Sequence, residues 1–164
     1  MIPINTASAF VAIGFLQPPT FGAGVMNLES LNMVRILLVE EHPVVRQAVR
    51  EAIATQLDLS IAGEVATLEA ALAVIERTEI NLAIVDMSLG SEDGLTVVRK
   101  LRQVAPGLRV LMYSLYQESL FAEPAFKAGA DGYLMKNEPP DRLIYAIREV
   151  LAGRKYSSPP LPPR

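Results

Sequence analysis

The sequence predicts a doubly wound α/β fold, in which helices cover both faces of a parallel sheet. Short apolar runs of strand length occur five times between Val34 and Met135. Each run is followed by a segment whose apolar residues recur at helical spacing. Such strand–helix repeats favour parallel strands joined by right-handed crossovers. The 164 residues, 51% of them hydrophobic, are sufficient for one domain with a substantial core.

Five strand–helix units are expected in order along the chain. The expected strands are 34–39, 59–65, 80–85, 109–113 and 132–135. The expected helices are about 43–57, 67–78, 95–103, 119–128 and 141–152. In the first helix, Arg46 and Arg50 fall on the polar face.

Local signals mark several helix ends. Pro43 suits a first helical turn, and Thr67 is the expected N-cap of the second helix. Gly129 and Gly153 follow the fourth and fifth helices, where glycine commonly ends a helix. Pro124 lies inside the fourth helix, so we expect one missing backbone hydrogen bond and a kink there.

Composition excludes several classes of function. The absence of cysteine excludes disulfides and thiolate metal sites, and is compatible with the cytoplasm. A net charge of −3 without a basic block disfavours direct binding to nucleic acid. The apolar stretch 9–16 is far shorter than the roughly 20 residues of a membrane-spanning helix. We therefore expect no membrane association. Residues 1–33, of which 1–28 carry no ionisable side chain, are interpreted as a disordered extension or a mis-assigned start.

Polar residues follow four of the five strands. In a parallel sheet these strand ends meet at one edge, where open α/β sheets bind their ligands. The residues are Glu40, Glu41, Asp86, Ser114 and Lys136. Clustered carboxylates can bind Mg²⁺, and an ammonium with a hydroxyl can hold a phosphoryl group. Asp86 could then act as a nucleophile that forms an acyl phosphate. Any one of these residues alone would be interpreted as a solvated loop residue, and only the set in this order favours the functional interpretation.

These motifs resemble the receiver domain of bacterial two-component response regulators over residues 34–156. The resemblance is carried by Leu37–Pro43, Asp86 with Leu89 and Gly94, Ser114, and Gly129–Lys136. Two further segments, His42–Arg46 and Val150–Arg154, are similar to the NarL/FixJ subgroup. The resemblance implies a flavodoxin-like (βα)5 fold with strand order 2-1-3-4-5.

The resemblance also implies a signalling role for the site. Asp86 would accept a phosphoryl group from a histidine kinase, with Mg²⁺ bound by Glu40, Glu41 and Asp86. Ser114 and Lys136 would contact the phosphoryl group, and Ser114 and Tyr133 would form the switch. Phosphorylation would alter the face made by the fourth helix, fifth strand and fifth helix.

Further expectations concern partners and chemistry. A homodimer could form through that switching face or through the first and fifth helices. Beyond Mg²⁺-dependent self-phosphorylation and autodephosphorylation, no enzymatic activity is expected, and the location would be cytoplasmic. A flavin site would need a polar phosphate loop where Glu40–Pro43 stands, and a haloacid-dehalogenase-type phosphatase would need an aspartate at Ser88. Both alternatives are disfavoured.

The chain departs from the family pattern at the acidic pair. The family usually has aspartate at one or both of the positions of Glu40 and Glu41, and a longer side chain shifts the carboxylate in a site where Mg²⁺ requires near-octahedral geometry. A phosphate-independent receiver that acts as a protein-interaction module is therefore the alternative. Gly90 and Asn137 stand where prolines are frequent. For His42, the sole histidine, a turn or capping role is favoured over a metal or catalytic one.

The last residues form a proline-rich tail, 157–164, whose composition favours extended polyproline geometry. NarL/FixJ regulators normally continue into a helix-turn-helix DNA-binding domain, which these residues cannot form. Two interpretations stay open: a stand-alone receiver, or a receiver separated from its DNA-binding half. In either case this chain by itself is not expected to bind DNA.

Overall fold

The computed structural model describes residues 33–158. The strands are β1 (Val34–Val39), β2 (Leu59–Val65), β3 (Leu82–Val85), β4 (Ser88–Leu89), β5 (Glu92–Asp93), β6 (Arg109–Ser114), β7 (Gly132–Met135) and β8 (Tyr156–Ser157). The helices are α1 (Pro43–Ala54), α2 (Leu68–Arg77), α3 (Gly94–Val104), α4 (Glu118–Ala128) and α5 (Pro140–Leu151). The expected N-terminal extension and the tail after Ser158 lie outside the described residues.

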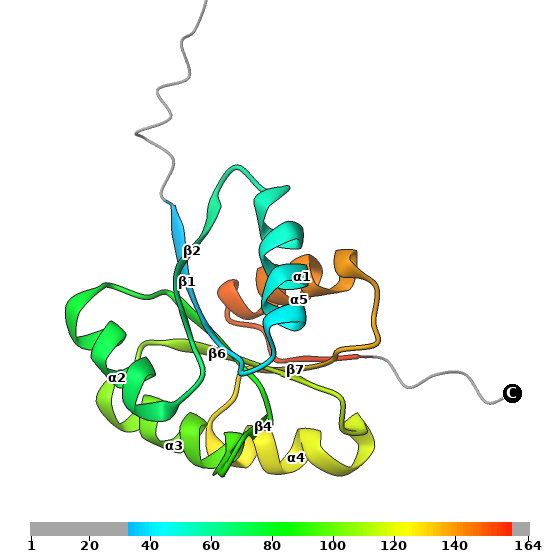
Figure 1. The fold of residues 1–164 in the computed structure, drawn as a ribbon. Coiled ribbons are helices and arrows are strands. Elements are labelled where there is room, and N and C mark those ends of the chain that lie inside the picture. Colours follow the sequence, from blue (N-terminus) through cyan, green and yellow to red (C-terminus); the bar gives the residue numbers. More distant parts are fainter. Residues whose placement is uncertain (1–32, 159–164) are drawn as a thin grey trace, which may run out of the picture. The chain divides into compact units, whose positions relative to one another are not determined.

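Six strands form one parallel sheet in the order β2-β1-β3-β6-β7-β8. Helices α1 and α5 lie on one face and α2, α3 and α4 on the other (Figure 1). Strands β4 and β5 form a separate hairpin, so β6 and β7 are the fourth and fifth strands of the main sheet along the chain. Its first five strands, β2-β1-β3-β6-β7, therefore have the predicted order 2-1-3-4-5. The doubly wound, flavodoxin-like fold is therefore confirmed.

The central strands are buried on both faces. In β1, Leu37 and Val39 pack with α2 and α3, whereas Ile36 and Leu38 pack with α1 and α5. The residues of β3 are also buried without alternation. This burial explains why the strands read as continuous apolar runs in the sequence.

The predicted helix signals are found in place. Thr67 accepts a hydrogen bond from the Ala70 N–H at 3.2 Å, and Pro43 occupies the first residue of α1. Gly129 ends α4 in the left-handed conformation, with φ of 112°. Helix α4 continues through Pro124 to Ala128, so the proline does not end it.

The connection after Asp86 contains a hairpin that the sequence reading did not predict. Strands β4 and β5 pair in antiparallel register around a two-residue turn at Gly90 and Ser91. Gly90 has φ of +60°, and glycine at the first turn position is typical of a type II′ hairpin turn. The Glu92 carboxylate accepts a hydrogen bond from the Leu68 N–H at 2.8 Å, which ties this hairpin to the start of α2.

The C-terminal segment adds a sixth strand to the sheet. Tyr156 and Ser157 pair in parallel with Gly132 and Tyr133 of β7. This strand includes the first residue of the segment that we interpreted as a tail, and it covers part of the edge of β7. Among residues 33–158, no helix is both long enough and apolar enough to cross a membrane.

Candidate functional site

The sheet register brings the predicted polar residues to one edge. The Glu40 N–H donates to the Val65 carbonyl, and the Asp86 N–H donates to the Val39 carbonyl, each at 2.9 Å. The Lys136 N–H donates to the Ser114 carbonyl at 2.7 Å. These bonds extend the pairing one residue beyond β1, β3 and β7. Residues distant in sequence thereby become neighbours.

Lys136 joins two of the predicted carboxylates. Its Nζ lies 2.5 Å from Glu40 Oε2 and 2.9 Å from Asp86 Oδ2. The three side chains are 5%, 1% and 5% exposed, in the order Lys136, Glu40 and Asp86. Removing one partner from such a buried ionic group leaves a charge without compensation, which is strongly destabilising. The stability of the folded state therefore depends on the charges of these three side chains.

Burial shapes the protonation of Asp86. Removal from water raises the pKa of the Asp86 carboxyl above its ordinary value, although Lys136 acts in the opposite direction. The charge on Glu40 adds to the upward shift. Nearby, burial also raises the pKa of the Tyr113 hydroxyl, with a further contribution from Glu40. A phosphoryl group or a cation bound at this edge would therefore change the balance of charges around Asp86.

His42 lies between the two glutamates. Its Nδ1 is 2.9 Å from Glu40 Oε1, which also accepts a hydrogen bond from the His42 backbone N–H at 2.9 Å. Its Nε2 is 4.0 Å from Oε1 of Glu41, a side chain that is 34% exposed. His42 occupies the N-cap position of α1 but makes no side-chain capping bond. His42 therefore lies at the start of the helix, as predicted. Its ring contacts the acidic pair and does not cap α1.

Possible metal-ligand atoms gather around Asp86. One oxygen or nitrogen each of Glu40, His42 and Asp86 lies within 4.8 Å of the others. Glu41, which we expected at a metal site, is outside this group and lies at the rim. Two carboxylates in such a group provide the hard oxygen donors that Mg²⁺ prefers.

Arg46 contacts the same loop from α1, a contact that the sequence reading missed. Its Nη1 donates to the carbonyls of Glu40 at 2.7 Å and Glu41 at 3.1 Å. The helical pattern placed Arg46 on a polar face with Arg50, which makes no such contact with this loop. The two arginines differ because Arg46, the fourth residue of α1, reaches back to the loop, and helical periodicity cannot reveal this contact.

On the other side of Asp86, hydroxyl groups converge on one backbone segment. Ser114 is fully buried, and its Oγ accepts a hydrogen bond from the Tyr116 N–H at 3.0 Å. Tyr133, also fully buried, donates from its hydroxyl to the Tyr116 carbonyl at 3.0 Å. Both predicted switch residues therefore hold the β6–α4 connection. Leu115, next to Tyr116 in the chain, and Leu120, in the first turn of α4, are exposed apolar residues.

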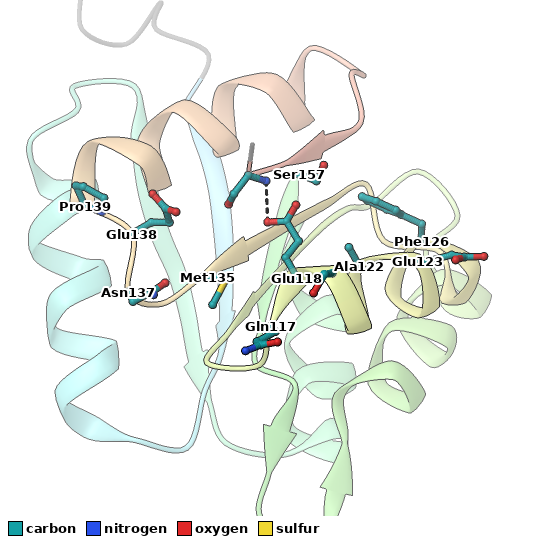
Figure 2. A pocket seen from close by; sticks show the side chains of 12 residues that line it. Gln117, Glu118, Ala122, Glu123, Phe126, Met135, Asn137, Glu138, Pro139 and Ser157 are labelled. Carbon is teal, nitrogen blue, oxygen red and sulfur yellow. Dashed lines mark hydrogen bonds between the residues drawn. The ribbon is translucent and has the colours of Figure 1, made fainter. Parts of the chain in front are cut away.

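A groove of about 1000 Å³ lies beyond this connection, between α4, the β7–α5 connection and β8. Figure 2 shows Glu118 reaching from α4 toward β8, where its carboxylate accepts a hydrogen bond from the Ser158 N–H at 2.9 Å. Burial raises the pKa of the Glu118 carboxyl. Phe126 and Met135 contribute apolar surface to the groove.

Comparison with protein families and curated sequences gives a consistent result. Residues 36–148 match the model of the response regulator receiver domain. The chain is 30% identical over 128 residues to the nitrate/nitrite response regulator protein NarL of Escherichia coli K12, covering 78% of this chain and 59% of NarL. It is 34% identical over 120 residues to the transcriptional regulatory protein YhcZ of Bacillus subtilis, covering 73% of this chain and 56% of YhcZ. The chain thus spans less than two thirds of these relatives.

Solved structures show the same likeness. A two-component response regulator of the LuxR family from Aurantimonas sp. SI85-9A1 superposes with a TM-score of 0.74 at 35% identity, covering 77% of this chain and 91% of that one. The signal receiver domain of the response regulator NarL from Mycobacterium tuberculosis gives a TM-score of 0.69 at 27% identity, covering 75% and 99%.

Proposed function

This chain belongs to the response regulator receiver domain family, and we propose that Asp86 accepts a phosphoryl group from a histidine kinase. The observation that carries the proposal is the buried contact of Asp86 with Lys136 at 2.9 Å, beside Glu40. Asp86 would attack phosphorus with a carboxylate oxygen, forming an acyl phosphate as the bond to the kinase histidine breaks. Lys136 would then pair with the phosphoryl oxygens. The domain is a signalling module and not an enzyme in the ordinary sense.

The residues around Asp86 fit a magnesium ion. Glu40 and Asp86 supply carboxylate oxygens, and Glu41 could join them from the rim because it is partly exposed. A bound Mg²⁺ would supply positive charge to neutralise the phosphoryl oxygens. Lys136 already neutralises part of the carboxylate charge, so it would have to share Glu40 and Asp86 with the cation.

We propose that the signal passes from Asp86 through the β6–α4 connection to the face of α4, β7 and α5. Ser114 and Tyr133 both bind the backbone of Tyr116, so movement of Ser114 toward a phosphoryl group would disturb the start of α4. Tyr133 is fully buried in the described structure, and its hydroxyl donates to the Tyr116 carbonyl, so movement of this ring would also change the start of α4. A homodimer through this face would have to include β8, whereas one through α1 and α5 would not.

A phosphate-independent mode is the second candidate. Lys136 lies close to both Glu40 and Asp86, and this contact satisfies the site without any ligand. Such a domain would act as a protein-interaction module with a fixed output face. The glutamate pair, with its longer side chains, is the feature that favours this alternative.

The decisive experiment is incubation of the purified chain with acetyl phosphate and Mg²⁺, followed by intact mass measurement. We expect the gain of one phosphoryl group, which Asp86→Asn and chelation of Mg²⁺ by EDTA both abolish. Asp93→Asn is the matched control, because Asp93 is an exposed aspartate in the neighbouring hairpin and should leave uptake unchanged. A wild-type chain that gains no mass would instead favour the phosphate-independent mode.

The proposals on partner and location are based on the receiver family to which this chain belongs. We propose a histidine kinase as the phosphodonor, and a cytoplasmic location for this domain. The net charge of −3 and the glutamates of the α4 groove disfavour direct contact with nucleic acid. A gel shift with genomic fragments should show no sequence-specific complex with this chain.

A further inference from the structure

The backbone that carries the acidic pair is held by a single guanidinium group. Arg46 Nη1 donates to the carbonyls of both Glu40 and Glu41, at 2.7 and 3.1 Å. These residues belong to the short connection between β1 and α1, which begins with the ladder bond from the Glu40 N–H to Val65. The connection is thus fixed at its start by the sheet and along its length by Arg46.

Arg46 is itself oriented by a neighbouring strand. Its Nε lies 3.6 Å from Glu64 Oε2, and the Arg46 side chain is 24% exposed. Glu64 also accepts two hydrogen bonds from Arg50 Nη1, at 3.0 and 2.7 Å. Glu64 lies on β2 opposite Leu38 of β1, two residues before Glu40. The arrangement connects the sheet, α1 and the acidic loop through charged hydrogen bonds and the Arg46–Glu64 ion pair.

This contact has a specific consequence for glutamate side chains. A glutamate has one more side-chain torsion than an aspartate, so its carboxylate can reach more positions from a given backbone. A planar guanidinium donates in fixed directions, and therefore restrains the two peptide groups more than a flexible ammonium would. Fixing these peptide groups restricts the positions that the two carboxylates can reach. Such restriction favours binding of Mg²⁺, which requires near-octahedral geometry.

We infer that Arg46 is a positioning residue for Mg²⁺: it fixes the Glu40–Glu41 backbone so that the longer carboxylates can meet a divalent cation beside Asp86. The inference rests on the proposed magnesium-dependent function. It assigns a role in metal binding to a residue that contacts the acidic pair only through main-chain oxygens.

The test is Mg²⁺ titration of the full chain by isothermal calorimetry, wild type against Arg46→Met. Loss of groups that orient metal ligands typically weakens metal binding by 10–100-fold, and we expect a rise in Kd of about tenfold. Charge alone predicts the opposite sign, because removing a nearby cation should strengthen binding of Mg²⁺. The direction of the change therefore separates positioning from general electrostatics.

Arg50→Met is the matched control, because Arg50 lies on the same helix and binds the same Glu64 but does not contact the acidic loop. We expect its Kd to be unchanged or lower. Arg46→Lys keeps the charge without the planar fork, and should fall between wild type and Arg46→Met. It also keeps the test decisive if the methionine variant, checked by circular dichroism, does not fold.

Phosphorylation by acetyl phosphate gives a second readout. In Arg46→Met the Mg²⁺ concentration for half-maximal rate should rise, while the rate at saturating Mg²⁺ changes much less. An Arg46→Met or Arg46→Lys variant with wild-type affinity, or an equal loss in Arg50→Met, would overturn the inference. If wild type binds Mg²⁺ but gains no phosphoryl group, the proposed function fails while the calorimetric test of Arg46 still stands. A wild type that binds no Mg²⁺ would overturn both.

Discussion

The two sides of Asp86 are held by different kinds of contact. On the β1 side, Glu40 is paired with the Lys136 ammonium, and Arg46 holds the loop through charged hydrogen bonds. On the β6 side, Ser114 and Tyr133 bind the Tyr116 backbone through hydroxyl groups. Charged contacts between buried groups are strong but costly to leave incomplete, whereas neutral hydrogen bonds contribute roughly 1 kcal/mol each.

The difference separates two tasks in one site. The charged side fixes the position of groups that would meet a cation and a phosphoryl group. The hydroxyl side can rearrange at a small energetic cost, and it adjoins the exposed Leu115 and Leu120. We therefore expect changes on the β1 side to affect stability and metal binding most, and changes on the β6 side to affect mainly the response of α4.

The largest expected effect comes from breaking the charged side with Lys136→Met. Two buried carboxylates, Glu40 and Asp86, would lose their cation, and removal of one partner from a buried ion pair costs about 3–5 kcal/mol. Urea unfolding at pH 7 measures the loss. Lys127→Met is the control, because Lys127 pairs with Glu123 on the surface of α4 and its removal should cause no comparable change. Equal losses in both variants would contradict the assignment.

The next effect comes from Gly94→Ala, which disturbs the support beneath Asp86. A Cβ at Gly94 would lie 2.2 Å from the Asp86 carbonyl oxygen and 2.7 Å from the Met87 Cα, so the backbone must shift. Overpacking of this kind costs about 1–3 kcal/mol, and phosphoryl uptake should slow as well. Gly107→Ala, with no heavy atom within 4 Å of its added Cβ, should leave both measurements unchanged.

A smaller effect is expected on the hydroxyl side from Tyr133→Phe. The variant keeps the buried ring but loses the hydrogen bond to the Tyr116 carbonyl, for a stability loss of about 0.5–1.5 kcal/mol. Phosphoryl uptake at Asp86 should stay at the wild-type rate, while hydrogen exchange in residues 115–120 increases. A slowed uptake without faster exchange would show that the two sides are not separable.

The smallest effect concerns pH, because burial and Lys136 act on Asp86 in opposite directions. The folded-state pKa of Asp86 is raised, so the folded protein binds more protons than the unfolded chain above the ordinary aspartate value. The wild type should therefore lose stability as pH rises from that value through the raised pKa, and Asp86→Asn should remove this loss. Urea unfolding between pH 4 and pH 8 tests the sign. A steeper slope in Asp86→Asn would contradict it.

Much of the site could be predicted because it depends on strand ends. Asp86 and Lys136 follow apolar runs in the sequence, and the parallel register brings such positions together without knowledge of any side-chain contact. Thr67 and Gly129 could be assigned because caps depend on local backbone geometry. The order of strands required the family resemblance as well as the periodic pattern.

The parts that escaped prediction are very short strands and side-chain contacts that follow no sequence periodicity. Strands β4 and β8 have two residues each, too few for periodicity, although glycine followed by serine at residues 90–91 was a signal for a hairpin turn. The reach of Arg46 to the acidic loop has no signature in the helical pattern. His42 is the N-cap residue of α1 and lies beside the acidic pair, and its ring contacts Glu40. Capping preferences do not predict this contact.

The strand β8 bears on how this domain should be cut for laboratory use. The family match ends at residue 148, before β8 begins at Tyr156. A version shortened to the end of α5 would leave the β7 edge uncovered, and an uncovered strand edge is a template for pairing with another chain. Versions that end before Tyr156 should therefore self-associate more than versions that retain Ser158, and a fusion partner placed after Ser158 would begin beside α4.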